Sequence, residues 1–384
     1  MRVRRADGRH LSVAVGAAGV HRRLHTTPRA MRAVFAALAA APLLAGCSTA
    51  SYYWQGIRGQ FDLLQRAEPI PQVLSTTQDA TLKRKLERVL AIRDYASSAL
   101  GLPDNKSYRS YTDINRRFVL WNVFAAPELS LTPRQWCFPV AGCVNYRGYF
   151  AEADARAEAA QVSAAGDDVY VGGVPAYSTL GYFNDPMLST VVRYPDIEIA
   201  RLVFHELAHQ VAYAKGDTVF NESFAVSVES EGLRRWTAAQ NDPQLIAQLA
   251  AAQRYREGFR QLVERTRDEL SALYASKASD ADKRSGKAAA LSRMRADYEA
   301  MKREWSGYAV YDNWFAQGPN NASLAAVGLY TQKVPEFRAL LAVEGDDLPR
   351  FYAKVKELAA LPKEARDASF AALIGRPYAA ASAP

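Results

Sequence analysis

The sequence predicts an α+β fold, mainly α, in which a small β-rich region at residues 115–180 precedes a helical second half. Aromatic and β-branched residues are concentrated in the β-rich region, where Pro127, Pro133 and Pro139 interrupt them, a composition typical of short strands. From Asp196 onward, apolar residues recur at helical spacing. About 338 residues follow a predicted leader, enough for one large domain or two smaller ones with a sizeable core.

Residues 1–46 are predicted to be a leader and a lipoprotein signal peptide. Met31 and Arg32 form a short basic start, an apolar run follows, and Leu44-Ala45-Gly46-Cys47 has the small residues and the cysteine of a lipobox. An apolar run of roughly a dozen residues is too short to span a bilayer. Met31 is a better start for such a signal than Met1, so we interpret residues 1–30 as an overextended start. We expect Cys47 to be lipidated; the alternative is an uncleaved N-terminal helix.

The leader also explains the basic charge of the chain. The net charge of the whole sequence is +8, but residues 1–46 hold eight Arg and one Asp, which leaves 40 basic and 39 acidic residues after them. No nucleic-acid partner is therefore inferred. Ser48 after Cys47 resembles the pattern of bacterial lipoproteins sorted to the outer membrane. We expect a lipid-anchored protein of the bacterial cell envelope, at the outer membrane and facing the periplasm.

The first element after the leader is a predicted amphipathic helix at residues 79–100, which Gly101-Leu102-Pro103 would end. Residues 118–125 and 145–150 are then predicted to be strands. Between them lie Cys137 and Cys143, an even pair in an oxidising compartment, and we expect a disulfide that closes a short loop. The alternative, a second metal site, has no histidine nearby. Residues 151–163 read as a helix and residues 168–174 as a strand.

The next predicted helix runs from Asp196, as its cap, to a stop at Lys215-Gly216. It contains His205-Glu206-Leu207-Ala208-His209, and these two histidines are the only ones left once the leader is removed. Two imidazoles four residues apart share one helix face and can bind one metal ion. The carboxylate of Glu206 would stand beside the metal as a general base. The alternative is a pair of core histidines bonded to the backbone.

Zinc with two histidine ligands requires a third protein ligand and keeps one position open. The following predicted helix begins with Asn221 as a capping residue and places Glu222 in its first turn. A short loop would return this helix against the first, so Glu222 is the predicted third ligand of a single Zn²⁺. Glu229 is predicted to accept a hydrogen bond from a ligand histidine. The alternative for Glu222 is a solvated carboxylate that interacts with the helix dipole.

The remaining chain is predicted to be helical. Residues 242–305 read as two antiparallel helices with an exposed turn near residues 280–286, and their charge pattern is more typical of a solvated face than of a partner-binding arm. A further helix capped by Asn320 and Asn321 extends toward Tyr330. Residues 47–384 therefore form the predicted functional domain, with metal-site helices at about 196–240 and a helical C-terminal part at 241–384.

Taken together, these residues resemble known families. The combination of the histidine motif with Asn221-Glu222-Ser223-Phe224-Ala225 is similar to the gluzincins, zinc peptidases with a glutamate ligand, although the 12 residues between His209 and Glu222 are fewer than in the large members. Most of residues 47–384 is similar to a family of bacterial lipoproteins described as putative aminopeptidases. The segments that carry this second resemblance are 136–143, 146–150, 172–181, the histidine motif and 320–322.

The resemblance implies a gluzincin-like zinc peptidase whose substrate is a peptide held against an edge strand. We expect that edge at Val169–Thr179, with Gly172, Gly173, Val174 and Tyr177 in contact with substrate; a tight turn without a substrate role is the alternative. An oxyanion donor is also required. Tyr330 is the predicted donor, by its similarity in position to the gluzincin tyrosine, and Tyr177 is its rival.

Two further choices stay open at the level of sequence. An exopeptidase requires an anion near the amino terminus of its substrate, for which Asp185 and Glu152 are candidates. The competing classes of function are a noncatalytic lipoprotein that uses zinc to join two helices, and an endopeptidase or peptidoglycan-peptide hydrolase. Glu206 has no structural duty in a closed zinc site, so its presence favours catalysis.

Overall fold

The computed structural model describes residues 51–138, 142–329 and 332–374. Two compact units are distinguished, Met1–Trp54 and Gln55–Pro384, and the second contains the sheets and the metal-site helices. The leader, Cys47 and Tyr330 lie outside the described residues. Within the described part of the chain, no helix combines the length and the apolar character needed to cross a membrane.

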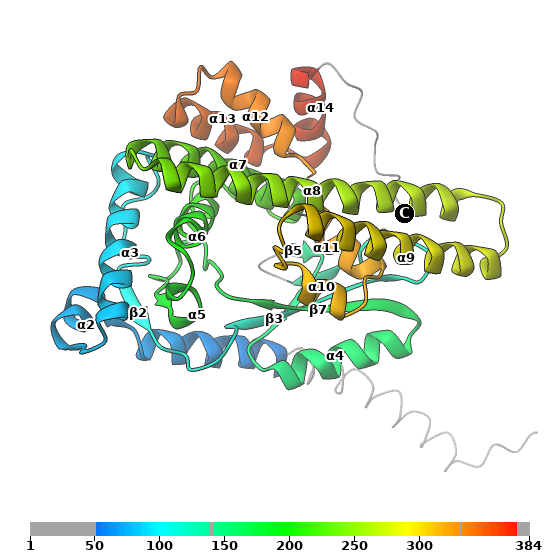
Figure 1. Cartoon of the computed structure of the whole chain (residues 1–384), viewed down its shortest axis with the longest axis horizontal. Helices are drawn as coiled ribbons and strands as arrows, with labels where there is room; N and C mark the ends of the chain where they lie inside the picture. Colours follow the sequence, from blue (N-terminus) through cyan, green and yellow to red (C-terminus); the bar gives the residue numbers. More distant parts are fainter. Residues whose placement is uncertain (1–50, 139–141, 330–331, 375–384) are drawn as a thin grey trace, which may run out of the picture. The chain divides into compact units, whose positions relative to one another are not determined.

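The β-rich region consists of short strands and one central sheet. In that sheet the order is β6-β3-β7, and β3 (Leu120–Pro127) pairs antiparallel with β6 (Arg147–Tyr149) and with β7 (Asp167–Val174). Strand β3 is buried along nearly its whole length because α4 (Glu152–Ala164) and α11 (Asn321–Leu329) both pack on the sheet. Figure 1 shows α4 and α11 on opposite sides of β3 and β7. The predicted helix at 151–163 and strand at 168–174 are confirmed.

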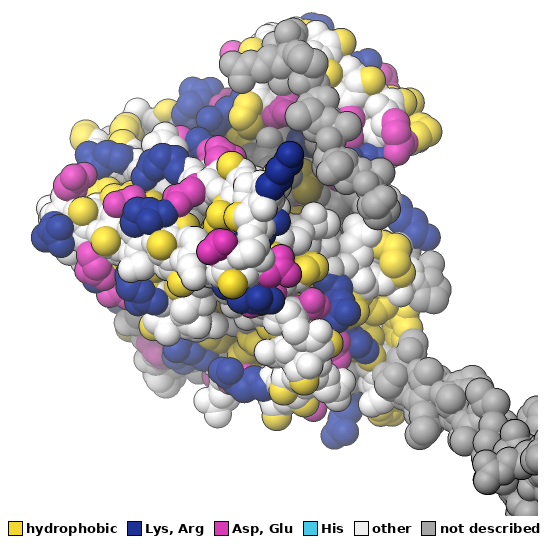
Figure 2. Space-filling view, turned by 90° about the vertical axis from the view of Figure 1, so that its right-hand side faces the viewer, with side chains coloured by type: hydrophobic (Ala, Val, Ile, Leu, Met, Phe, Trp, Pro, Cys, Tyr) yellow, Lys and Arg dark blue, Asp and Glu magenta, His cyan; other side chains and the backbone are white. Residues whose placement is uncertain are grey.

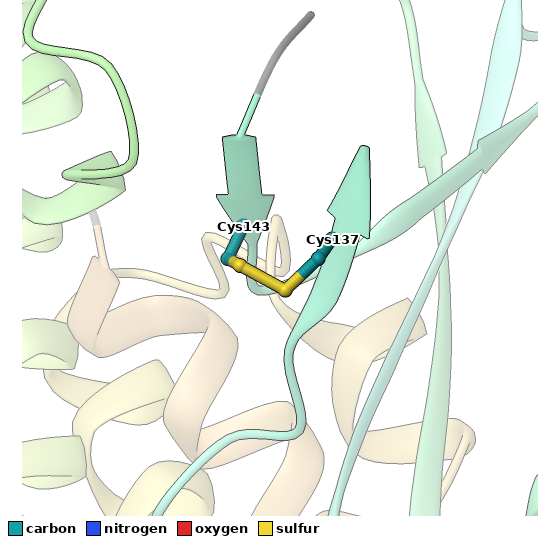
Figure 3. Close-up of a disulfide and its surroundings, with 2 residues drawn as sticks. All are labelled: Cys137 and Cys143. Atoms are coloured by element: carbon teal, nitrogen blue, oxygen red, sulfur yellow. A yellow bond between two sulfur atoms is a disulfide. The ribbon is translucent and has the colours of Figure 1, made fainter. Parts of the chain in front are cut away.

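Two smaller sheets complete the strands. One has the order β1-β2-β8 and joins Glu68–Pro69, Ser110–Thr112 and Met187–Leu188. The other is the hairpin of β4 (Trp136–Phe138) and β5 (Gly142–Val144), in which Cys137 pairs opposite Cys143. These two cysteines form the predicted disulfide, which links the two strands of the hairpin (Figure 3).

The helices surround a core built mainly on α6 and α7. Buried side chains of α3, α6, α7, α12 and α13 form one continuous cluster, whose largest members include Phe204, Phe220, Phe224, Trp236 and Phe337. The fold is thus mainly α, as predicted. The helices not bounded elsewhere are α2 (Ile70–Thr76), α3 (Ala80–Ser98), α5 (Ser189–Val192), α10 (Asp312–Ala316), α12 (Val334–Val343), α13 (Leu348–Ala360) and α14 (Lys363–Ile374).

The predicted antiparallel helix pair is present, but its turn lies earlier than expected. Helix α8 (Pro243–Ala275) packs against α9 (Asp280–Glu304), so the connection comprises residues 276–279 instead of 280–286. Ser279 caps α9 by accepting a hydrogen bond from the Asp282 backbone N–H. Gly286, expected in the turn, lies inside α9, where a Cβ would be 2.7 Å from the Leu273 side chain. A close helix–helix contact, and not a turn, explains that glycine.

The surface is of mixed charge. On the face shown in Figure 2, basic and acidic side chains are interspersed. Among the described residues, exposed intrahelical pairs such as Arg260 with Glu257 and Lys354 with Glu357 contribute little to stability.

Candidate metal centre and its surroundings

Helix α6 (Asp196–His209) carries the histidine motif and is anchored at both ends. Its apolar face is buried, and its first residue, Asp196, accepts hydrogen bonds from Lys85 (2.8 Å) and Arg88 (3.0 Å) of α3. The N-cap position belongs to Pro195, so the prediction that Asp196 is the cap was off by one residue. The predicted stop at Lys215-Gly216 was also wrong. The helix ends at His209, and Gly216, with a φ of +78°, lies in the loop that leads to α7.

The loop between the two helices is fixed by polar side chains of α7 (Thr218–Ala239). Asn221 accepts a hydrogen bond from the Ala214 backbone N–H (2.7 Å) and donates one to its carbonyl (2.9 Å). Asp217 is the N-cap of α7 and also pairs at 2.8 Å with the buried guanidinium of Arg366. Asn221 is therefore not the helix cap that the sequence predicted. It closes the loop, and this places the next residue, Glu222, against α6.

The metal-binding side chains predicted from the sequence lie together. His205 Nε2 is 3.2 Å from His209 Nε2 and 3.3 Å from Glu222 Oε2, and His209 Nε2 is 3.6 Å from the same oxygen. Ligands about 2.0–2.1 Å from a tetrahedral zinc ion are separated by about 3.3–3.4 Å. The spacing of these three atoms therefore fits a zinc ion, and no other group of this kind is found among the described residues.

The donor chemistry also fits a cation. Two imidazole nitrogens that face each other cannot both be acceptors without a proton or a metal between them. Burial opposes charge on His205, yet hydrogen bonds to Glu222 and Glu229 raise its pKa to about 10 in the metal-free protein. Burial likewise opposes charge on Glu222, but the two histidines lower its pKa to about 2. The site thus holds positive charge between three donors, as a metal ion would.

A second layer of side chains orients the first histidine. His205 Nδ1 is 2.9 Å from Glu229 Oε2, so the imidazole donates to this carboxylate and turns Nε2 toward Glu222. Arg201 stands 3.6 Å from the same oxygen and is held at 2.8 Å by Glu198. Burial opposes the charge of Glu229, and Arg201 and His205 outweigh it, so its pKa is lowered. By contrast, His209 Nδ1 is buried without a hydrogen-bond partner among the described residues.

Glu206 differs from the other two glutamates of the site. It is partly exposed, and within the described part of the chain it makes no hydrogen bond or ion pair. Burial raises its pKa, and the nearby His205 and His209 act in the opposite direction. A carboxylate left uncommitted beside three converging ligands is suited to accept a proton.

Two loops pack against the side of α6 that bears Glu206. Gln210 lies one helical turn after Glu206 and therefore on the same side. It accepts a hydrogen bond from Asn105 (2.7 Å) and donates one to Ser107 (3.3 Å). The backbone of Gly181 also lies beside it, since a Cβ there would be 3.4 Å from Gln210 Oε1. Segments 105–108 and 179–185 therefore form the wall next to the general-base candidate.

This wall contributes two polar residues with unusual surroundings. Tyr108 is 2% exposed, has a φ of 61°, and its hydroxyl has no hydrogen-bond partner in the described part of the chain. A bulky residue in the left-handed region is a backbone outlier of the kind found at functional sites. Asp185, 4% exposed, accepts hydrogen bonds from the backbone N–H (2.9 Å) and hydroxyl (2.8 Å) of Thr179. The Tyr108 backbone N–H donates to the Asp185 carbonyl at 2.6 Å.

The charges of the wall interact with the catalytic candidate. Burial raises the pKa of Asp185 to about 6, and the nearby Glu206 adds to the rise. Burial also raises the pKa of Tyr108, with Glu206 and Asp185 as the next causes. Nothing in the sequence marks Tyr108, because it reaches the site through the fold and belongs to no motif. Tyr213 was missed as well; burial and then Glu222 raise the pKa of its partly exposed hydroxyl.

The predicted substrate-contact residues lie on β7 and in the segment that follows it. Gly172, Gly173 and Val174 belong to β7, which is an edge strand of its sheet as expected, and no hydrogen bond or ion pair of the described residues joins them to the histidines. The ring of Phe118 packs against Gly173, and a Cβ at position 173 would lie 2.3 Å from that ring. The Tyr177 hydroxyl donates to Gln60, and its ring packs edge-on against Phe150.

Comparison with known families places the chain. A family model described as "Putative aminopeptidase" matches residues 51–370, which include all the described residues of the metal centre and its wall. The chain belongs to this putative aminopeptidase family. Comparison with curated proteins and with solved structures gave no match. The family resemblance expected from the sequence is thus confirmed, and in this member the histidine motif lies where α6 and α7 meet the wall.

Proposed function

We propose that the protein is a zinc-dependent aminopeptidase in which His205, His209 and Glu222 hold one Zn²⁺ and Glu206 is the general base. The observation that supports it most is the contrast among the site's carboxylates. Glu222 and Glu229 are both committed to histidines, whereas Glu206 is left without a hydrogen bond beside them among the described residues. A zinc ion that only joined two helices would not require this free carboxylate.

The residues of the site have separate roles in the proposed reaction. A bound zinc ion supplies Lewis acidity that polarises a carbonyl group and acidifies water. Glu206 is placed to accept the proton of the attacking water and to return it to the leaving amine. Glu229 and Arg201 hold His205 in the tautomer that presents Nε2 to the metal side.

An oxyanion donor completes the proposed reaction. Tyr330, the choice from the sequence, lies outside the described residues. Tyr213 is the described tyrosine whose hydroxyl interacts electrostatically with Glu222 and is partly exposed. Tyr177 is committed to Gln60. The donor in our proposal is therefore Tyr330 or Tyr213, and a pair of Tyr→Phe variants distinguishes them.

The decisive experiment combines metal analysis with hydrolysis of short peptides. Wild-type protein lacking residues 1–46 is expected to bind about one zinc ion and to release N-terminal residues, and chelation should abolish this activity. Glu206→Gln keeps size and metal ligands, so it should retain the zinc and lower kcat/KM by about 10² to 10⁴-fold. The control is Glu231→Gln, whose carboxylate pairs with Arg234 and Arg235. Hydrolysis by Glu206→Gln at the control's rate refutes the mechanism.

We further propose that the protein acts in the bacterial cell envelope, anchored by lipid on Cys47 at the outer membrane and facing the periplasm. Support comes from the lipobox at Leu44–Cys47 and from the Cys137–Cys143 disulfide, a bond typical of oxidising compartments. Membrane fractionation of the Cys47→Ala variant tests the anchor. The protein should move from the membrane pellet to the soluble fraction, and its retention in the pellet would contradict the proposal.

A further inference from the structure

The wall beside Glu206 holds a buried negative charge without a countercharge. Asp185 is 4% exposed and forms no ion pair, and its carboxylate oxygens accept hydrogen bonds only from Thr179 among the described residues. The remaining lone pairs of both oxygens are unused. A buried carboxylate without a cationic partner is costly, and buried charges in proteins are ordinarily paired. A ligand with a positive charge would therefore be a suitable partner for the Asp185 carboxylate.

A second and independent observation points to the same place. The hydroxyl of Tyr108 is buried and has no hydrogen-bond partner in the described part of the chain. The Tyr108 backbone N–H donates to the Asp185 carbonyl at 2.6 Å, so the two residues lie next to each other, and Glu206 and Asp185 both act electrostatically on the hydroxyl. Buried polar groups without a partner are rare and call for an explanation such as a ligand or an ordered water. Two buried polar groups with unused hydrogen-bonding capacity, the Asp185 carboxylate and the Tyr108 hydroxyl, thus belong to neighbouring residues of the wall beside the helix of Glu206.

The position of this cluster is fixed rigidly. The guanidinium of Arg93 is fully buried and donates to the carbonyls of Ser107 (2.9 Å), Pro103 (2.7 Å) and Asn105 (3.1 Å), which holds the loop that carries Tyr108. No hydrogen bond or ion pair joins Arg93 to Asp185 among the described residues. Thr179 holds the loop that carries Asp185. Gln210 links the loop that carries Tyr108 to the helix of Glu206.

We propose that Asp185 and Tyr108 form the binding site for the free α-ammonium group of the peptide substrate. An ammonium group carries three N–H donors and no acceptor, which matches a carboxylate and a hydroxyl oxygen with free lone pairs. Glu206, which is partly exposed, adds negative charge nearby. This site rests on the proposed peptidase function and deepens it, since it restricts cleavage to the first peptide bond. Between the two carboxylates considered from the sequence, Asp185 is favoured, because Glu152 is on the surface and pairs with Arg156.

The test compares paired substrates, a short peptide with a free amino terminus and the same peptide with an N-acetyl group. Wild-type zinc enzyme should prefer the free peptide. Asp185→Asn keeps the size and can still bond to Thr179, so it should lose about 10- to 100-fold in kcat/KM for the free peptide, the range of a charged hydrogen bond. The value for the acetylated peptide should not change. Tyr108→Phe should lower the same preference by about 3- to 10-fold without lowering the Tm, since it removes a hydroxyl that has no partner among the described residues.

The control is Glu152→Gln, which should keep the wild-type preference. An unchanged preference in Asp185→Asn overturns the ammonium site, and so does a wild-type enzyme that cleaves both peptides equally well. Failure of the proposed function itself has a different result, because then the wild-type enzyme would cleave neither peptide in a zinc-dependent manner. An equal loss on both peptides in Asp185→Asn shows a purely structural role and also overturns the proposal.

Discussion

The hydrogen bond from His205 to Glu229 yields a quantitative prediction for zinc affinity. Glu229→Gln replaces a charged acceptor at 2.9 Å by a neutral amide of the same size. Charge-assisted hydrogen bonds are roughly twice as strong as neutral ones. Loss of such a partner behind a metal-bound histidine typically weakens metal binding by about 10- to 100-fold, which is about 1.4–2.8 kcal/mol. We expect a loss in this range, because Glu229 is also buried beside Arg201.

Titration of the metal-free variant with zinc, in competition with a chromogenic chelator, measures the change. The fold should be retained, since Arg201 keeps its 2.8 Å bond to Glu198 when Glu229 loses its charge. Glu231→Gln is the matched control on the same helix and should bind zinc as the wild type does. At saturating zinc, Glu229→Gln should regain most of its kcat. A zinc affinity equal to that of the control would show that Glu229 does not support the ligand.

Three further outcomes are expected. Burial raises the pKa of Asp185 from 3.8 to about 6, so the folded state holds this proton more tightly and loses stability as the pH rises between these values. Asp185→Asn should remove that loss of about 2–3 kcal/mol, and thermal unfolding from pH 4 to pH 8 should show a flatter curve; an unchanged curve contradicts the assignment. Of Tyr213→Phe and Tyr330→Phe, the one that removes the oxyanion donor should lower kcat by about 10² to 10³-fold with little change in KM, and if neither does, both candidates are excluded. Asp217→Ala should destabilise the protein by about 3–5 kcal/mol, because it leaves the buried guanidinium of Arg366 in α14 without its carboxylate. Asp79→Ala, which removes an exposed helix cap, should cost about 1 kcal/mol. Similar Tm values for the two variants would refute this prediction.

The sequence was sufficient to predict that His205, His209 and Glu222 lie together, because their arrangement depends on local geometry. His205 and His209 lie one helical turn apart, and a short loop leaves few places for Glu222. The prediction for Asn221 failed because its hydrogen bonds to Ala214 depend on where the first helix ends, and that end came at His209, several residues before the predicted stop. Gly286 was predicted to be a turn residue, but it lies inside a helix, and close packing against Leu273 explains why this position is a glycine.

Asp185 was one of two candidates from the sequence, but its place in a wall beside Tyr108 could not be predicted, for a different reason. Tyr108 and Asp185 are separated along the chain from each other and from Glu206, and only the packing of loops on Gln210 brings them together. The left-handed backbone of Tyr108 has no local sequence cause, since glycine and asparagine are the usual residues there. No periodicity, capping rule or motif contains this information.

The metal centre and its wall therefore have different origins in the chain. His205, His209, Glu222 and Glu229 all come from one helix–loop–helix of adjacent residues, so these side chains meet through contacts of short sequence separation, which form early and quickly in folding. The two wall segments, 105–108 and 179–185, come from other parts of the chain, and neither contains a proposed metal ligand. Mutation and selection can therefore alter the wall while the three proposed ligands and Glu229 stay intact. In related chains, residues 105–108 and 179–185 are where changes of substrate preference should accumulate.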